Sequence, residues 1–221
     1  MEGDSVTICT HVNINQQEKI KWYFNNTIIA LIKGDLSVIC TDVQCKGGDV
    51  RFRDRLKLDH HTGSLNIRNI TNTHSGNYTL IIMKGSDTEK IFKIFVHGVS
   101  AAKRDEMKRK SVEEGESVTL GPGEERKPND VMTWYFNDTI IARDRSKDVN
   151  ERFRGRLKLD HQTGSLTIMN TRNTDDGEYK LQISSCRFNI IRSFSVSVTG
   201  EYYVVILILE YIIFKLIHFF Y

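Results

Sequence analysis

Apolar and polar residues alternate over short runs along most of the chain, and turn residues separate the runs. An alternation of period two places every second side chain on the same face of a β-strand, so the pattern predicts half-buried strands. No helical pattern interrupts these runs. The clearest runs place these residues inward: Val6 and Ile8; Ile20, Trp22 and Phe24; Leu65 and Ile67; Tyr78, Leu80 and Ile82; Phe92, Ile94 and Val96.

The chain contains an internal repeat, which organises it into two similar halves. Three segments of the first repeat return in the second: Glu2–Ile8 as Glu114–Leu120, Trp22–Ala30 as Trp134–Ala142, and Arg51–His60 as Arg152–His161. The first repeat carries an insertion between Ala30 and Arg51. We therefore expect two β-domains at residues 1–97 and 112–198, joined by a polar, basic linker or lead-in strand at 98–111.

Short alternating strands, an early tryptophan and a late Gly-x-Tyr segment resemble the variable-type domain of the immunoglobulin superfamily. The predicted fold class is all-β, with two tandem variable-type sandwiches. The resemblance implies a disulfide between strands B and F, but the matching positions hold Thr10 with Leu80 and Pro122 with Leu181. No disulfide is therefore expected between the sheets of either domain. The residues that carry the resemblance form the expected core signature: Trp22, Tyr78, Leu80, Trp134, Tyr179 and Leu181.

The runs Arg55–Ile67 and Arg156–Ile168, together with the missing disulfide, resemble the membrane-distal domains of SLAM-family leukocyte adhesion receptors. Within that family the chain is most similar to the expanded, fish-type group of immunoglobulin-like receptors. The resemblance implies a non-enzymatic cell-surface protein that binds another immunoglobulin-type protein, homophilically or heterophilically, in immune cell contact. No paired-carboxylate, triad or phosphate-loop motif indicates an enzyme, and no cofactor is implied.

In such receptors the ligand-binding face is the exposed side of strands G, F and C of the outermost domain. Alternation assigns the outward residues of that face in the first domain, and their lysines favour a partner with an acidic surface. The predicted ligand-binding residues are Lys19, Lys21, Tyr23, Thr79, Ile81, Met83, Lys93 and Phe95.

The C-terminal segment 202–221 is almost wholly apolar and has the length of a membrane-spanning helix. Glu210 near its middle costs about 3 kcal/mol, which the surrounding Val, Ile, Leu and Phe outweigh. We expect a single-pass plasma-membrane protein with an extracellular N-terminus, and Glu210 and Lys215 could recruit a charged signalling adaptor. A buried β-rich tail is the alternative. The N-terminus lacks a signal peptide, which favours a truncated or processed start.

Four cysteines are present. Cys40 and Cys45 lie five residues apart inside the insertion, which predicts a local disulfide. A zinc site of these two residues with His60 and His61 is the alternative. The second repeat keeps the histidine at His161 but lacks both cysteines, which argues against metal. Cys9 and Cys186 are expected to be free or to pair between chains.

Basic residues alternate along the predicted strand D of each repeat. The net charge is only +3, from 31 basic and 28 acidic residues, which argues against nucleic acid as a partner. A soluble or matrix-associated module that binds heparan sulfate through these stripes remains the alternative function. The stripes are also explained by a solvated strand face, with Arg156 paired to Asp175. His74 replaces that aspartate in the first repeat. The stripes are Arg51, Arg53, Arg55 and Lys57, and Arg152, Arg154, Arg156 and Lys158.

Four Asn-x-Thr sequons predict N-glycosylation in a chain of secreted type. Asn77 lies beside the expected tyrosine corner, where the surroundings could enclose it. The predicted glycosylation sites are Asn25, Asn69, Asn77 and Asn137.

Overall fold

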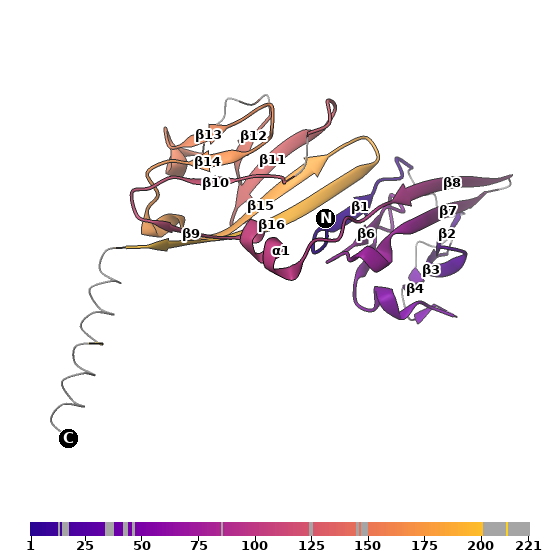
Figure 1. The fold of residues 1–221 in the computed structure, drawn as a ribbon. Helices are drawn as coiled ribbons and strands as arrows, with labels where there is room; N and C mark the ends of the chain where they lie inside the picture. Colours follow the sequence, from indigo (N-terminus) through magenta and orange to yellow (C-terminus); the bar gives the residue numbers. More distant parts are fainter. Residues whose placement is uncertain are drawn as a thin grey trace, which may run out of the picture. The chain divides into compact units, whose positions relative to one another are not determined.

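The computed structural model forms two compact units (Figure 1). It describes residues 1–12, 14, 18–33, 38–41, 44–45, 47–84, 86–123, 126–144, 146, 150–200 and 211. Unit 1 comprises Met1–Arg104, Asn129–Val131 and Gln182–Arg192. Unit 2 comprises Asp105–Pro128, Met132–Leu181 and Ser193–Tyr221.

Unit 1 contains the first repeat, folded as two layers of antiparallel strands. One sheet has the order β4-β3-β2-β7-β8, and the other layer is built from β1, β6 and β5. The strands of the first sheet are β2 (Lys19–Phe24), β3 (Thr27–Ile32), β4 (Val38–Thr41), β7 (Gly76–Lys84) and β8 (Ser86–Ile94). Those of the second layer are β1 (Ser5–Ile8), β5 (Leu56–Leu58) and β6 (Leu65–Ile67).

The core of unit 1 lies between these layers, and its signature residues are completely buried. Trp22, Tyr78 and Leu80 are each 0% exposed. The indole Nε1 of Trp22 donates a 2.8 Å hydrogen bond to the carbonyl of Gly63, and the hydroxyl of Tyr78 donates one of 2.8 Å to the carbonyl of His74. The second bond is the expected tyrosine corner.

The second repeat has the same two-layer plan. One sheet has the order β12-β11-β15-β16, with β9 parallel to the end of β16, and the other has the order β10-β14-β13 (Figure 1). Its strands are β9 (Arg109–Glu113), β10 (Val118–Leu120), β11 (Val131–Phe136), β12 (Thr139–Arg143), β13 (Leu157–Leu159), β14 (Leu166–Ile168), β15 (Gly177–Ser184) and β16 (Phe188–Thr199).

The second core repeats the hydrogen bonds of the first. Trp134 donates 3.0 Å to the carbonyl of Gly164, and Tyr179 donates 2.8 Å to the carbonyl of Asp175. Trp134, Tyr179 and Leu181 are each 0% exposed. The buried tryptophan and tyrosine of the two repeats therefore make equivalent hydrogen bonds.

The cysteines follow the sequence prediction. Cys40 and Cys45 form a disulfide, so the local bridge is confirmed and both sulfurs that a zinc site would need are already bonded. Cys9 is half-buried and free, and Cys186 is exposed and free. In the first repeat, Thr10 (3% exposed) and Leu80 stand where the cross-sheet cysteines would be.

Short helical elements replace parts of the predicted linker and strands: helix α1 and the 3₁₀ turns Val50–Phe52 and Glu151–Phe153. The segment 98–111 begins with helix α1 (Ala101–Lys108), since Ser100 accepts the backbone N–H of Lys103 and of Arg104 and the sequence after it consists of good helix formers. Only its end joins strand β9. Val50–Phe52 is a 3₁₀ turn, capped by the carboxylate of Asp49.

The predicted membrane helix at 202–221 lies outside the described residues, apart from Tyr211. Within the described part of the chain, no helix has the length and apolar character needed to span a bilayer.

Candidate recognition face of unit 1

The outward residues of β2, β7 and β8 lie in rows across the sheet. Strand pairing places Lys19 beside Met83 and Lys21 beside Ile81. Tyr23 pairs with Thr79 in the next row. All eight residues predicted from the sequence lie at outward positions of this sheet or of the segment that continues β8, and we call this surface the β2–β7–β8 face.

The face also contains residues that the sequence prediction missed. On β8, Asp87 pairs with Met83, Glu89 with Ile81, and Ile91 with Thr79. The alternation that assigned Lys93 outward would have assigned these three as well if it had been continued toward the start of the strand. They change the charge of the face, because two acidic residues lie on β8, across β7 from the two lysines of β2.

The charges are therefore separated across the sheet. Neighbouring strands lie about 4.8 Å apart, so the lysine strand β2 and the acidic strand β8 are separated by about 10 Å with β7 between them. The middle strand presents Ile81 and Met83, both half-buried. The expectation of a basic face that selects an acidic partner is wrong for this surface, which is basic along β2 and acidic along the outer half of β8.

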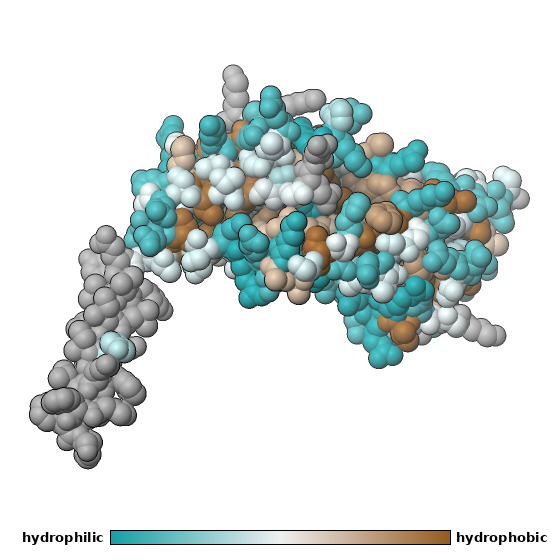
Figure 2. All heavy atoms as spheres, in the orientation of Figure 1, coloured by the Kyte–Doolittle hydropathy of each residue, from teal (hydrophilic) through white to brown (hydrophobic). Residues whose placement is uncertain are grey.

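Exposed apolar residues complete the face. Phe95 is 75% exposed and Ile91 is 57% exposed, and the Phe95 ring meets His97 edge-on at 4.9 Å between ring centroids. Most of the surface visible in Figure 2 is hydrophilic, with smaller hydrophobic areas. Large exposed apolar side chains beside charges are typical of protein interfaces.

The basic stripes are not the regular strand faces that the sequence predicted. Arg51 belongs to the 3₁₀ turn, its guanidinium pairs with Asp49, and it stacks 4.8 Å from the ring centroid of Phe24. Strand β5 begins only at Leu56. In the second repeat Arg152 stacks over Phe136 at 4.6 Å, and Arg156 is 7% exposed. These arginines are used within the fold, which weakens a polyanion site.

Arg156 forms the predicted buried ion pair. Its Nη2 donates to Asp175 Oδ1 at 3.1 Å, and Nη1 donates to Oδ2. Burial by itself would raise the pKa of Asp175, but the hydrogen bonds from Arg156 and from the backbone N–H of Arg172 outweigh it, so the pKa lies below its ordinary value. This carboxylate stays charged and holds the corner before β15.

His74 takes the place of that carboxylate in the first repeat. It is 2% exposed; its Nδ1 accepts the backbone N–H of Thr71 at 3.0 Å and its Nε2 donates to the carbonyl of Arg51 at 2.9 Å. The first bond needs the neutral imidazole, because a protonated Nδ1 cannot accept a hydrogen bond. Burial, reinforced by the charges of Arg55 and Arg51, lowers the pKa of His74 below its ordinary value. Arg55 instead donates to the carbonyl of Asn69.

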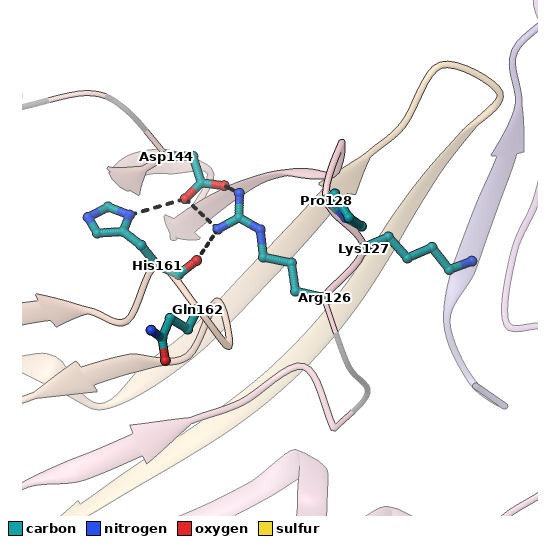
Figure 3. Close-up of a pocket in the computed structure, with 6 residues that line it drawn as sticks. All are labelled: Arg126, Lys127, Pro128, Asp144, His161 and Gln162. Carbon is teal, nitrogen blue, oxygen red and sulfur yellow. Dashed lines mark hydrogen bonds and ion pairs between the residues drawn. The ribbon is translucent and has the colours of Figure 1, made fainter.

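Unit 2 has a pocket of about 570 Å³ whose lining includes the ion pair between Arg126 and Asp144. Figure 3 shows the Arg126 guanidinium between the carboxylate of Asp144 and the backbone carbonyl of His161, whereas the side chain of Lys127 points away from them. Nη2 of Arg126 lies 2.6 Å from Asp144, whose side chain is 2% exposed. Asp144 also accepts the backbone N–H of Met132 at 2.9 Å.

The internal repeat shows that the fold does not require this pair. The equal spacing of the repeated segments aligns Arg126 with Ile14 and Asp144 with Ile32. Those isoleucines are buried, at 9% and 0% exposed. The same place is thus filled by apolar packing in one repeat and by an ion pair in the other.

The four sequon asparagines are all exposed. Asn25 and Asn137 lie in the tight turns after β2 and β11 with positive φ, which asparagine tolerates better than most residues. Asn77 is exposed and not enclosed, on the outward side of β7 opposite Lys93. Glycosylation at these positions stays a prediction.

Comparison with known proteins agrees with this architecture. Residues 106–199 match the model of the immunoglobulin V-set domain. Residues 106–199 therefore form an immunoglobulin V-set domain, and the first repeat shares its tryptophan and tyrosine-corner geometry. A comparison with curated proteins gave no match.

Three similar solved structures are as follows. The first Ig-like domain of human CD48 antigen is 26% identical, over 42% of this chain and 83% of that one, with a TM-score of 0.39. Murine CEACAM1b is 20% identical, over 90% and 94%, with a TM-score of 0.32. Sidekick-1 immunoglobulin domains 1–5 are 17% identical, over 82% and 33%, with a TM-score of 0.37.

Proposed function

We propose that the protein is a cell-surface recognition receptor whose β2–β7–β8 face binds another immunoglobulin-type protein. The observation that carries the proposal is the composition of that face, where lysines, acids, aromatic and aliphatic side chains lie together at outward positions of one sheet. The SLAM-like sequence runs and the apolar segment 202–221 support a plasma-membrane location with an extracellular N-terminus.

The charge separation limits which partners fit. A complementary surface presents acidic groups opposite Lys19 and Lys21, and basic groups opposite Asp87 and Glu89. Exposed charges mainly set the association rate and its dependence on salt, whereas Tyr23 and Phe95 supply affinity.

The test is adhesion of cells that display the chain to a panel of leukocyte surface proteins on a solid phase. The triple variant Lys21→Glu, Tyr23→Ala, Lys93→Glu should lose binding, because Tyr23 alone is expected to contribute roughly 1–3 kcal/mol. Lys57→Glu is the matched control, since Lys57 is exposed on β5 of the other layer.

Two outcomes would count against this function. Unchanged adhesion by a folded triple variant would move the site away from the face. Loss of adhesion in Lys57→Glu, together with retention on a heparin column at physiological salt, would favour the polyanion-binding alternative.

A further inference from the structure

We infer that strand β1 is an acceptor edge that takes strand β16 from a second copy of this chain as well as from its own, so that two chains exchange this strand. The inference goes beyond the proposed function and does not use the β2–β7–β8 face. It follows from the way the sheet of unit 1 is completed at β1.

A strand from the far end of the chain closes this sheet. Strand β1 pairs with β6 on one side and with the first residues of β16 on the other, antiparallel, with Ile8 opposite Phe188. The segment Gln182–Arg192 accordingly belongs to unit 1. Phe188 and Ile190 pack against the core of that unit, and the Phe188 ring meets Phe92 edge-on at 6.2 Å between ring centroids.

A buried ion pair fixes the register of the added strand. Nη2 of Arg192 donates to Oδ2 of Asp4 at 2.6 Å, and its Nε donates to Oδ1 at 3.1 Å. The two side chains are 2% and 0% exposed, and the N-terminal amine of Met1 lies 3.2 Å from the same carboxylate. A buried charge that loses its partner is strongly disfavoured, so the edge selects a strand that carries an arginine at this position.

The second repeat shows that this edge can also stand without an added strand. Its equivalent strand, β10, pairs only with β14 among the residues that the structure describes. The residue that aligns with Asp4 is Glu116, which is exposed. Closure by β16 is therefore an addition to the fold of a single repeat, and the buried carboxylate of Asp4 is particular to the edge that receives it.

A second copy fits this edge because β16 makes the same contacts whichever chain supplies it. Strands β1 and β16 are the first and the last described, so β1 is synthesised well before the strand that covers it. An uncovered strand edge is a template for pairing with another chain. Exchange of an identical element keeps every contact of the closed chain and is a low-cost route to a dimer. Two chains that exchange β16 are joined twice, once at each β1.

The first experiment uses full-length chains with two different C-terminal epitope tags, co-expressed in one cell, solubilised and co-precipitated. Asp4→Arg and Arg192→Asp each place like charges at the contact within one chain. In a mixture of the two variants, both exchanged contacts join opposite charges. The mixture should therefore co-precipitate at least about tenfold more strongly than either variant alone. Co-precipitation no stronger than that of the single variants overturns the inference.

Two controls separate exchange from other kinds of association. Asp175→Arg mixed with Arg156→Asp reverses a buried ion pair whose partners lie in one repeat, and this mixture should stay at the level of its single variants. Adding Lys21→Glu, Tyr23→Ala and Lys93→Glu to both chains of the first mixture should leave its co-precipitation unchanged, because the face is not used. Association of the control mixture, or loss of association in the face variant, contradicts strand exchange.

A second measurement keeps the wild-type ion pair. Thr7 and Asn189 lie directly opposite each other on β1 and β16. Chains with Thr7→Cys and chains with Asn189→Cys, both also carrying Cys9→Ser and Cys186→Ser, should form a disulfide-linked pair on a non-reducing gel. Thr119→Cys, at the equivalent position of β10, should not link to Asn189→Cys. Absence of the first linked pair, or equal linkage through Thr119→Cys, rules out exchange at β1.

Discussion

Lowering the pH from 7 to 5 is expected to destabilise the first repeat through His74, while the equivalent corner of the second repeat keeps its charge. His74 is neutral in the fold, since its Nδ1 accepts the N–H of Thr71 and its Nε2 donates to the carbonyl of Arg51. In the unfolded chain a histidine binds a proton near pH 6.5. Below that pH the unfolded state holds more protons than the folded one, so the free energy of unfolding decreases as the pH is lowered.

The size of this effect has an upper limit set by the unfolded histidine. Each pH unit between the two pKa values corresponds to 1.36 kcal/mol, so acidification from pH 6.5 to 5 removes at most about 2 kcal/mol. That is a large part of the roughly 5–15 kcal/mol that stabilises a typical domain. Asp175 behaves differently because its pKa is lowered. Its contribution to the free energy of unfolding is complete above the ordinary carboxylate pKa range and is lost only in stronger acid.

Tryptophan fluorescence can follow each repeat separately, because the chain has two tryptophans and each is buried in one repeat. In a Trp134→Phe chain, urea unfolding reported by Trp22 should have a lower midpoint at pH 5 than at pH 7. Adding His74→Asp should abolish most of this difference, and a Trp22→Phe chain should show little of it. The reasoning is refuted if the pH difference persists in His74→Asp or is equal for both reporters.

Three further outcomes are expected. Tyr179→Phe leaves the buried carbonyl of Asp175 without its 2.8 Å hydrogen bond and should cost about 1–3 kcal/mol in denaturant unfolding. Asp144→Ala should lower the free energy of unfolding by about 3–5 kcal/mol, because Arg126 loses its carboxylate partner. The double variant Arg126→Ile, Asp144→Ile copies the first repeat and should be neutral or stabilising. Equal losses of stability in the two variants would contradict this. Non-reducing peptide mapping should recover Cys40 joined to Cys45, and free thiols at both positions would exclude the bridge.

Much of the core could be predicted from sequence because it depends on local alternation. The period of two assigned Trp22, Tyr78 and Leu80 inward, and all three are completely buried. The same rule placed the lysines of β2 outward. It missed Glu89 and Asp87 only because the alternation was not followed along the whole of β8.

Other features depend on contacts between distant segments, which alternation does not describe. Arg51 appeared to belong to a basic strand, but a cap from Asp49 turns the chain there and the guanidinium packs on Phe24 from another strand. The role of His74 depended on a comparison of the repeats, which identified the missing carboxylate. Its neutral state became evident only from the two backbone groups that it contacts.

The absence of a bridge between Thr10 and Leu80 has a mechanical consequence when the domain is under tension. A bridge between those positions would hold the intervening chain in a closed loop when the domain is pulled from its ends. The disulfide of this domain instead joins Cys40 to Cys45 and closes a loop of only a few residues. Residues 1–97 can therefore lengthen to roughly 330 Å at about 3.4 Å per residue once the sheets separate. Because the proposed contact is made by the β2–β7–β8 face of this same domain, a pull strong enough to separate its sheets would also release a partner bound there.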